Sequence, residues 1–140
     1  MKTSRIVFFI LLILILLVVV RETRLAYLRE SRVLDVISTF RKQCLQMGIA
    51  SWYGKGMTGR KTASGEKYNP RALTAAHRKF PFGTQLNVIN LENGRNVTVT
   101  VNDRGPYKNN RILDLSSEAA HRLGMKEPGL VAVCVQNSIE

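Results

Sequence analysis

The distribution of hydrophobic residues divides the chain into three stretches with different periodicities. The first is an uninterrupted apolar run over residues 6–20, with Lys2 and Arg5 before it and Arg21 and Arg24 after it. As a helix it would span ~22 Å, which is less than the ~30 Å hydrocarbon core of a bilayer. This length fits the apolar region of a signal peptide or a short signal anchor. Because no small-residue cleavage site follows directly, we expect residues 1–22 to form an uncleaved, membrane-spanning anchor.

The second stretch, residues 23–47, is predicted to be a helical connector beside the membrane. Its apolar side chains recur at helical spacing and would form one stripe along the helix. The stripe consists of Val33, Val36, Ile37, Phe40 and Cys44. Three surfaces could cover it: the membrane, a partner helix or the following domain.

The third stretch, residues 48–137, has the short alternating runs that are typical of β-strands. Strands are predicted over 49–53, 73–77, 84–91, 96–102, 111–115 and 130–136. Asn93-Gly94 predicts a hairpin with a type I′ turn, and Ser116 is expected to cap a short helix over 117–123. Six short strands with one or two short helices indicate a mainly-β fold, a small closed barrel that leaves no exposed sheet edge.

One strand ends in a group of polar residues with chemical potential. Val97, Val99 and Val101 share one face, and the chain then runs into the sequence NDRGPY at 102–107, in which Gly and Pro cannot continue a strand. Asp103 is therefore placed at the mouth of a loop that a rigid strand supports. Two interpretations remain open at this point: Asp103 closes a turn, or it is a functional carboxylate.

The net charge and its distribution limit the classes of partner that the chain is expected to bind. The formal net charge is +11, but the basic residues are spread along the chain and are not interleaved with aromatic residues in an array that would stack nucleobases. We therefore predict no nucleic-acid partner. A basic surface suits anionic lipids or the anionic polymers of a cell wall, although it could equally be a solvated surface without a partner.

The two cysteines, Cys44 and Cys134, do not have the spacing of metal ligands, and no cofactor-binding motif occurs. We expect neither a metal nor a cofactor. Outside the cytoplasm the two could form one disulfide, but two free thiols are the favoured expectation.

Five motifs, in order, resemble the rare lipoprotein A family of cell-envelope proteins. They are GIASWYG at 48–54, GRKTASGE at 59–66, LTAAH at 73–77, NDRGPY at 102–107 and ILDLS at 112–116. The resemblance implies a double-psi β-barrel, and several members are septal-ring-type lytic transglycosylases of peptidoglycan. The resemblance does not extend to the family's separate peptidoglycan-binding repeat domain, so we do not predict septal targeting. Nor do we predict a lipid anchor, because Cys44 lacks the flanking residues of a lipidation signal.

The resemblance also implies roles for individual residues. Asp103 would be the catalytic acid and base, and Glu66 and His77 occupy the positions that assist it in the family. Arg104 would lower the pKa of Asp103 and weaken it as an acid if it lay beside the carboxylate. Two expectations follow: either Arg104 points elsewhere, for example toward substrate, or the burial of Asp103 dominates. Candidate sugar-binding residues are Trp52, Tyr53, Arg104 and Tyr107. Asp114 is the rival acid, but its position between two leucines favours a structural role.

The function implied is an endolytic lytic transglycosylase that cleaves the bond between MurNAc and GlcNAc and leaves 1,6-anhydro-MurNAc ends. The substrate's own 6-hydroxyl group attacks, so a single carboxyl group can suffice. The alternatives are a non-catalytic expansin-like polysaccharide-binding module, or a glycoside hydrolase with a second carboxylate. The expected partners are peptidoglycan glycan strands and, through the N-terminal helix, the cytoplasmic membrane, with the barrel on its outer side.

Overall fold

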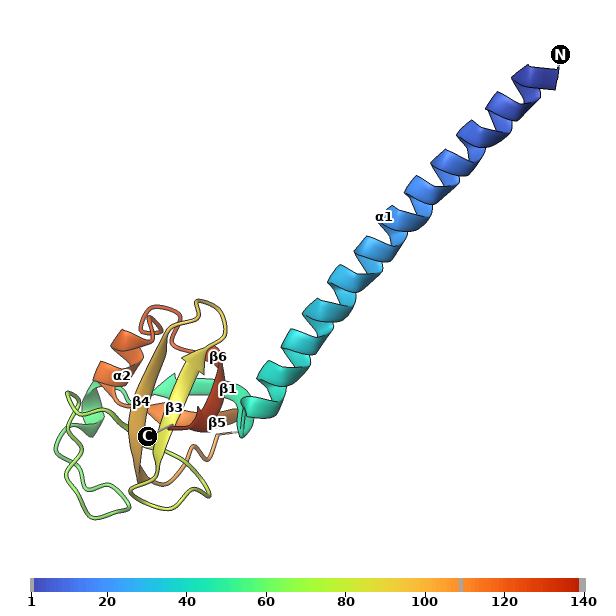
Figure 1. The fold of residues 1–140 in the computed structure, drawn as a ribbon. Coiled ribbons are helices and arrows are strands. Elements are labelled where there is room, and N and C mark those ends of the chain that lie inside the picture. Colours follow the sequence, from blue (N-terminus) through green and yellow to red (C-terminus); the bar gives the residue numbers. More distant parts are fainter. Residues whose placement is uncertain (1, 109, 139–140) are drawn as a thin grey trace. The chain divides into compact units, whose positions relative to one another are not determined.

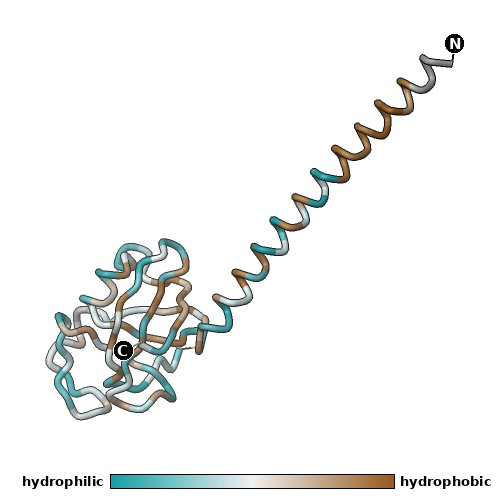
Figure 2. The backbone as a smooth tube through the Cα atoms, in the orientation of Figure 1, coloured by the Kyte–Doolittle hydropathy of each residue, from teal (hydrophilic) through white to brown (hydrophobic). Residues whose placement is uncertain are grey.

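The computed structural model describes residues 2–108 and 110–138, which fall into two compact units, Met1–Lys42 and Gln43–Glu140. The first unit consists of one helix, α1, Lys2–Gln43, which runs without interruption through the predicted anchor and most of the predicted connector. Its large apolar side chains from Val7 to Val20 are each between 52% and 63% exposed. Figure 2 shows this apolar stretch at the N-terminal end of the helix, followed by a more polar remainder.

The membrane-spanning role predicted for this segment is not confirmed. Among the described residues, no helix combines the length and the apolar character needed to cross a membrane.

The second unit is a closed barrel of six strands, as predicted (Figure 1). The strands are β1 Gln46–Trp52, β2 Thr74–Ala76, β3 Gln85–Asn90, β4 Asn96–Asp103, β5 Arg111–Leu115 and β6 Val131–Asn137. They close in the order β1-β5-β2-β4-β3-β6. The pairs β1–β5 and β2–β4 are parallel, whereas the other four pairs are antiparallel. Two short helices complete the unit, the 3₁₀ turn η1 Lys55–Met57 and α2 Ser117–Arg122.

The barrel interior is filled by the alternating apolar residues that the sequence pattern singled out. In β4, Val97, Val99 and Val101 are buried, and they pack with Leu86 and Val88 of β3 in one core cluster. β-branched residues suit such strands because their side chains fill a pleated surface with little loss of rotamer freedom. The same alternation leaves the outward positions of β4 free for polar residues.

The cap of α2 is also confirmed. The Ser116 side chain accepts a hydrogen bond from the Ala119 amide, and Gly124 follows the helix with φ +66°. Glycine suits that left-handed conformation because it has no Cβ. The short helix is thereby held at both ends.

The β3–β4 hairpin is confirmed, but the predicted type I′ turn is wrong. That turn needs positive φ at two successive residues, and Gly94 has it (φ 73°) whereas Asn93 does not. The connection is a longer loop over 91–95. Asn93 in the loop and Asn90 at the end of β3 both donate side-chain hydrogen bonds to the Leu123 carbonyl. Contacts with the end of α2 therefore set the loop geometry, and local turn preference does not.

The expectation of free thiols is wrong as well, because Cys44 and Cys134 form a disulfide. β1 begins at Gln46, two residues before the predicted start of the barrel domain, and pairs with β6 so that Met47 lies opposite Cys134. This pairing brings Cys44 within 5.5 Å (Cα–Cα) of Cys134, although 90 residues separate them.

Candidate functional site

Three hydrogen-bond donors hold the carboxylate of Asp103, the last residue of β4. Oδ1 accepts from the backbone amides of Ala63 and Arg104, both at 2.8 Å, and Oδ2 accepts from the Tyr53 hydroxyl at 2.7 Å. Each carboxylate oxygen has about two acceptor positions. Oδ1 therefore has both positions filled, and Oδ2 keeps one for a further partner.

Tyr53 follows directly after β1 and acts in the structure as a positioning donor. Burial raises the pKa of Tyr53 well above its ordinary value, and the hydrogen bond and negative charge of Asp103, together with the charge of Asp114, raise it further. The phenol therefore stays protonated at working pH. Its ring packs edge-on against Tyr68, with 5.0 Å between ring centroids, which restrains the direction of the hydroxyl group.

A tight loop over 62–66 brings Glu66 to the end of β4. The Thr62 amide donates to the Glu66 carbonyl at 2.8 Å, and Gly65 within the loop has φ +93°. Glu66 Oε2 accepts from the side-chain amide of Asn102 at 2.8 Å. Asn102 directly precedes Asp103, so one hydrogen bond joins Glu66 to the strand that carries Asp103.

His77 is joined to Asp103 through the backbone, while its ring has other partners. The His77 amide donates to the Asp103 carbonyl at 3.1 Å. Ring Nδ1 accepts from the amides of Lys79 and Phe80, so we assign the hydrogen to Nε2, which donates to Gln46 Oε1 at 2.9 Å. Burial, and then the nearby charges of Arg104, Arg78 and Lys79, lower the pKa of His77. The ring is therefore neutral near pH 7, with both nitrogens engaged.

The guanidinium group of Arg104 points away from the Asp103 carboxylate, which is one of the two expectations from the sequence. Its Nη1 donates to the Phe80 carbonyl at 3.1 Å and to the His77 carbonyl at 3.4 Å, and the group lies 3.7 Å over the Phe82 ring. Phe82 had not been singled out in the sequence, where no motif marks it. Arg104 thus holds the segment after β2 against the end of β4.

Asp114 lies two strands away from Asp103, and both of its carboxylate oxygens are engaged. Ser51 donates to Oδ1, and Arg111 forms an ion pair with Oδ2 at 3.2 Å. Ala76 of β2 pairs with both Asp103 and Asp114, so one small residue separates the two acidic positions. At two strand spacings, their Cα atoms lie about 10 Å apart.

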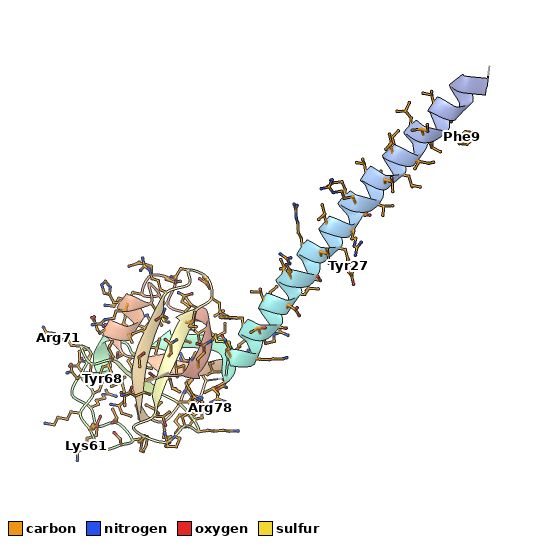
Figure 3. The ribbon with its side chains drawn as sticks, viewed as in Figure 1. Phe9, Tyr27, Lys61, Tyr68, Arg71 and Arg78 are labelled. Atoms are coloured by element: carbon orange, nitrogen blue, oxygen red, sulfur yellow. A yellow bond between two sulfur atoms is a disulfide. The ribbon has the colours of Figure 1, made fainter. Side chains whose placement is uncertain are left out.

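Two pockets lie at opposite ends of the parallel β1–β5 pair. The first, the aromatic pocket, has a volume of about 220 Å³ and lies at the C-terminal ends of these strands. Its wall includes Trp52, Tyr53 and Tyr68. The second, of about 300 Å³, is at their N-terminal ends and is lined by Gln46, His77, Arg78, Lys79, Arg111 and Ile112. Figure 3 labels Tyr68 for the first and Arg78 for the second.

The remaining predicted residues differ in exposure. Trp52 packs partly against the core and also lines the aromatic pocket, whereas Tyr107 is 82% exposed after Pro106.

Arg78, which no sequence motif marks, donates to the carbonyls of Pro106, Lys108 and Arg111. Within the described ranges, no group of three His, Cys, Asp or Glu side chains is placed to hold a metal ion.

The sequence and the fold both resemble those of known proteins. The family model described as lytic transglycolase matches residues 45–135. The endolytic peptidoglycan transglycosylase RlpA of Campylobacter jejuni is 58% identical over 86 residues, which are 61% of this chain and 31% of the relative. The proteins of the same name from Neisseria meningitidis and Pseudomonas aeruginosa are 46% and 47% identical, over 67% and 64% of this chain and 39% and 26% of theirs. The chain thus spans about a third of the length of these relatives.

Among solved structures, an expansin of Clavibacter michiganensis without ligand superposes with a TM-score of 0.52 at 25% identity, covering 67% of this chain and 50% of that one. The Streptomyces papain inhibitor superposes with a TM-score of 0.51 at 20% identity, covering 67% of this chain and 97% of that one. At this level of identity the papain inhibitor shows the fold alone.

Proposed function

The chain belongs to the lytic transglycolase family, and on that premise we propose that its barrel is an endolytic lytic transglycosylase of peptidoglycan. The observation that carries the proposal is the Asp103 carboxylate, held by three donors at the surface of the barrel with one acceptor position left on Oδ2. The RlpA relatives named above carry this activity in their names.

Asp103 would act twice in one turnover. Protonated at Oδ2, it gives its proton to the glycosidic oxygen as the bond from C1 of MurNAc breaks and GlcNAc leaves. The carboxylate then takes the proton of the MurNAc 6-hydroxyl as that oxygen attacks C1 and closes the 1,6-anhydro ring. Asp103 ends the cycle protonated again, and no water is consumed.

Glu66 and His77 support this step in different ways. Glu66, held by Asn102, would face the positive charge that develops on the sugar ring. His77 acts as a positioning residue, because its ring nitrogens are engaged and its amide donates to the Asp103 carbonyl. Sugar rings would stack in the aromatic pocket on Trp52 and Tyr53, with Tyr107 and Arg104 as further contacts on the loop after Asp103.

The two alternative functions are less well supported. A hydrolase needs a second carboxylate that can activate water or attack C1. Both oxygens of Asp114 are engaged, by Ser51 and Arg111. Glu66 accepts one hydrogen bond, from Asn102, and is the carboxylate that a hydrolase would have to use. An expansin-like binding module would use the same surface without cleaving the strand, and only a product assay separates it from the enzyme.

The assay is mass spectrometry of peptidoglycan after incubation with the full chain. New 1,6-anhydro-MurNAc ends are the expected product. New reducing ends would identify a hydrolase, and strands that are bound but not cut would identify a binding module.

We also propose that residues 1–22 anchor the chain in the cytoplasmic membrane and that residues 23–47 connect this anchor to the barrel. The barrel, residues 48–137, would lie on the outer side of that membrane, in the cell envelope. The apolar run and its exposed side chains support this arrangement. In cell fractionation, the full-length mass is expected in the membrane fraction, with the barrel accessible to protease added to spheroplasts. A shortened form in the soluble fraction would contradict the anchor.

A further inference from the structure

We propose that the basic pocket at the N-terminal ends of β1 and β5 binds a carboxylate of the substrate strand. The inference rests on the proposed function, because it assigns a second, anionic subsite to the same substrate. The pocket, of about 300 Å³, is distinct from the aromatic pocket at the other ends of these strands.

The charges around the pocket do not cancel. Arg78, Lys79 and Arg111 line it, and none of its six lining residues is acidic. Asp114 neutralises one of the three cations through its ion pair with Arg111, so two formal positive charges remain. The partners of Arg78 are neutral carbonyl groups, which orient its guanidinium group without removing its charge.

Donors are left over as well as charge. Arg111 Nε is buried and has no hydrogen-bond partner, which is a costly arrangement for a charged group. In the part of the chain that the structure describes, the Lys79 ammonium group has no hydrogen bond or ion pair. A bound carboxylate would accept hydrogen bonds from the exposed Lys79 ammonium group, whereas the buried Arg111 Nε lies out of its reach.

The basic pocket and Asp103 are placed so that one continuous glycan strand could contact both. Arg111 contacts Asp114, Asp114 and Asp103 flank Ala76, and Tyr53 links Asp103 to the aromatic pocket. A glycan that stacks on Trp52 and crosses Asp103 would therefore extend toward the basic pocket. Peptidoglycan offers carboxylates of two kinds there: the lactyl group of MurNAc in strands without peptides, and the acidic groups of stem peptides.

The test compares Lys79→Gln with Arg95→Gln, both in a full-length Asp103→Asn background so that substrate is not consumed. Lys79→Gln removes one pocket charge and nearly preserves side-chain length, and Arg95→Gln removes an exposed charge on the β3–β4 loop. Binding would be measured by calorimetry in detergent to peptide-free strands, to peptide-bearing strands, and to both after their carboxylates are converted to methylamides.

Lys79→Gln should weaken binding to acidic strands about two- to five-fold, in the range of an exposed ion pair, and leave binding to the amidated strands unchanged. The type of glycan strand, peptide-free or peptide-bearing, that shows this difference identifies which carboxylate occupies the pocket. Equal affinity of Lys79→Gln and its parent for every strand would overturn the inference, as would an equal loss in Arg95→Gln. Anhydro-product formation by the wild type is measured separately, so a binding result stands even if the chain proves not to cleave.

Discussion

The Tyr53 hydroxyl donates to Oδ2 of Asp103 at 2.7 Å, although 50 residues separate the two in the chain. Tyr53 directly follows β1 and Asp103 ends β4, and these two strands are not neighbours in the barrel, because β5 and β2 lie between them. The contact orients Oδ2, the one carboxylate oxygen that keeps a free acceptor position.

Asp103→Asn is expected to fold and to bind glycan but to lose anhydro-product formation. The amide preserves size and can still accept the backbone hydrogen bonds at Oδ1, yet it cannot exchange the catalytic proton. General acid–base catalysis contributes about 10²–10⁴-fold, so the loss should be clear in a chromatographic assay of anhydro ends. Near-native activity in this variant would assign the chemistry to another residue.

Asp114→Asn is the matched carboxylate change and should act mainly on stability. It breaks the ion pair with Arg111, whose side chain is only 21% exposed. Loss of one partner of a largely buried pair costs about 3 kcal/mol, which would lower the melting temperature of a domain of this size by roughly 10 °C or more. If the folded variant instead loses activity with an unchanged melting temperature, Asp114 belongs to the catalytic machinery.

Tyr53→Phe should lower kcat about ten-fold, the equivalent of one hydrogen bond to a charged group, while stability changes little. The ring and its packing on Tyr68 remain, and only the donor to Asp103 disappears. Tyr68→Phe provides the control, because its hydroxyl accepts from the Ser117 amide and does not reach Asp103. Equal losses of kcat in both variants would mean that Tyr53 acts through packing alone.

Acid should destabilise the barrel through His77. Burial, and then the charges of Arg104, Arg78 and Lys79, lower its pKa. As pH falls below about 6.5, the unfolded chain takes up a proton before the folded one does, so this contribution is fully present above that pH and is lost below it. Thermal unfolding between pH 7.5 and 5 would measure the effect.

The histidine variants separate this effect from general acid sensitivity. His77→Asn keeps an acceptor for the Lys79 and Phe80 amides but cannot titrate, so its melting temperature should depend less on pH. His121→Asn, at an exposed position of α2, is the control for replacing a histidine as such. The same slope in all three proteins would exclude His77 as the cause.

Reduction should lower the stability of the barrel. The Cys44–Cys134 disulfide closes a loop of 90 residues in the unfolded chain. Removing a native disulfide from a small domain typically costs about 2–5 kcal/mol. The melting temperature of the wild type should therefore fall in a strong reductant, whereas that of Cys44→Ala/Cys134→Ala should not respond to it. Insensitivity of the wild type would show that the disulfide does not form.

The sequence by itself determined the local features of this protein. Alternating valines predicted β4, Ser116 predicted the start of α2, and the Gly-Pro that follows Asp103 predicted that the carboxylate would lie at a strand end. Each of these depends on residues a few positions apart, where side-chain period and backbone preference act directly. The family motifs added the barrel type and the three residues proposed for the site.

Only the tertiary structure decided which distant groups meet. Two of the three donors to Asp103 come from Tyr53 and Ala63, 50 and 40 residues away. The His77 ring turns to Gln46, and Cys44 reaches Cys134. The type I′ turn failed for the same reason, since Leu123 holds the loop from outside. Periodicity shows which face of a strand is buried, but it carries no information on which strands pair or in what register. In a barrel whose strand order departs from chain order, that pairing places every group of the site.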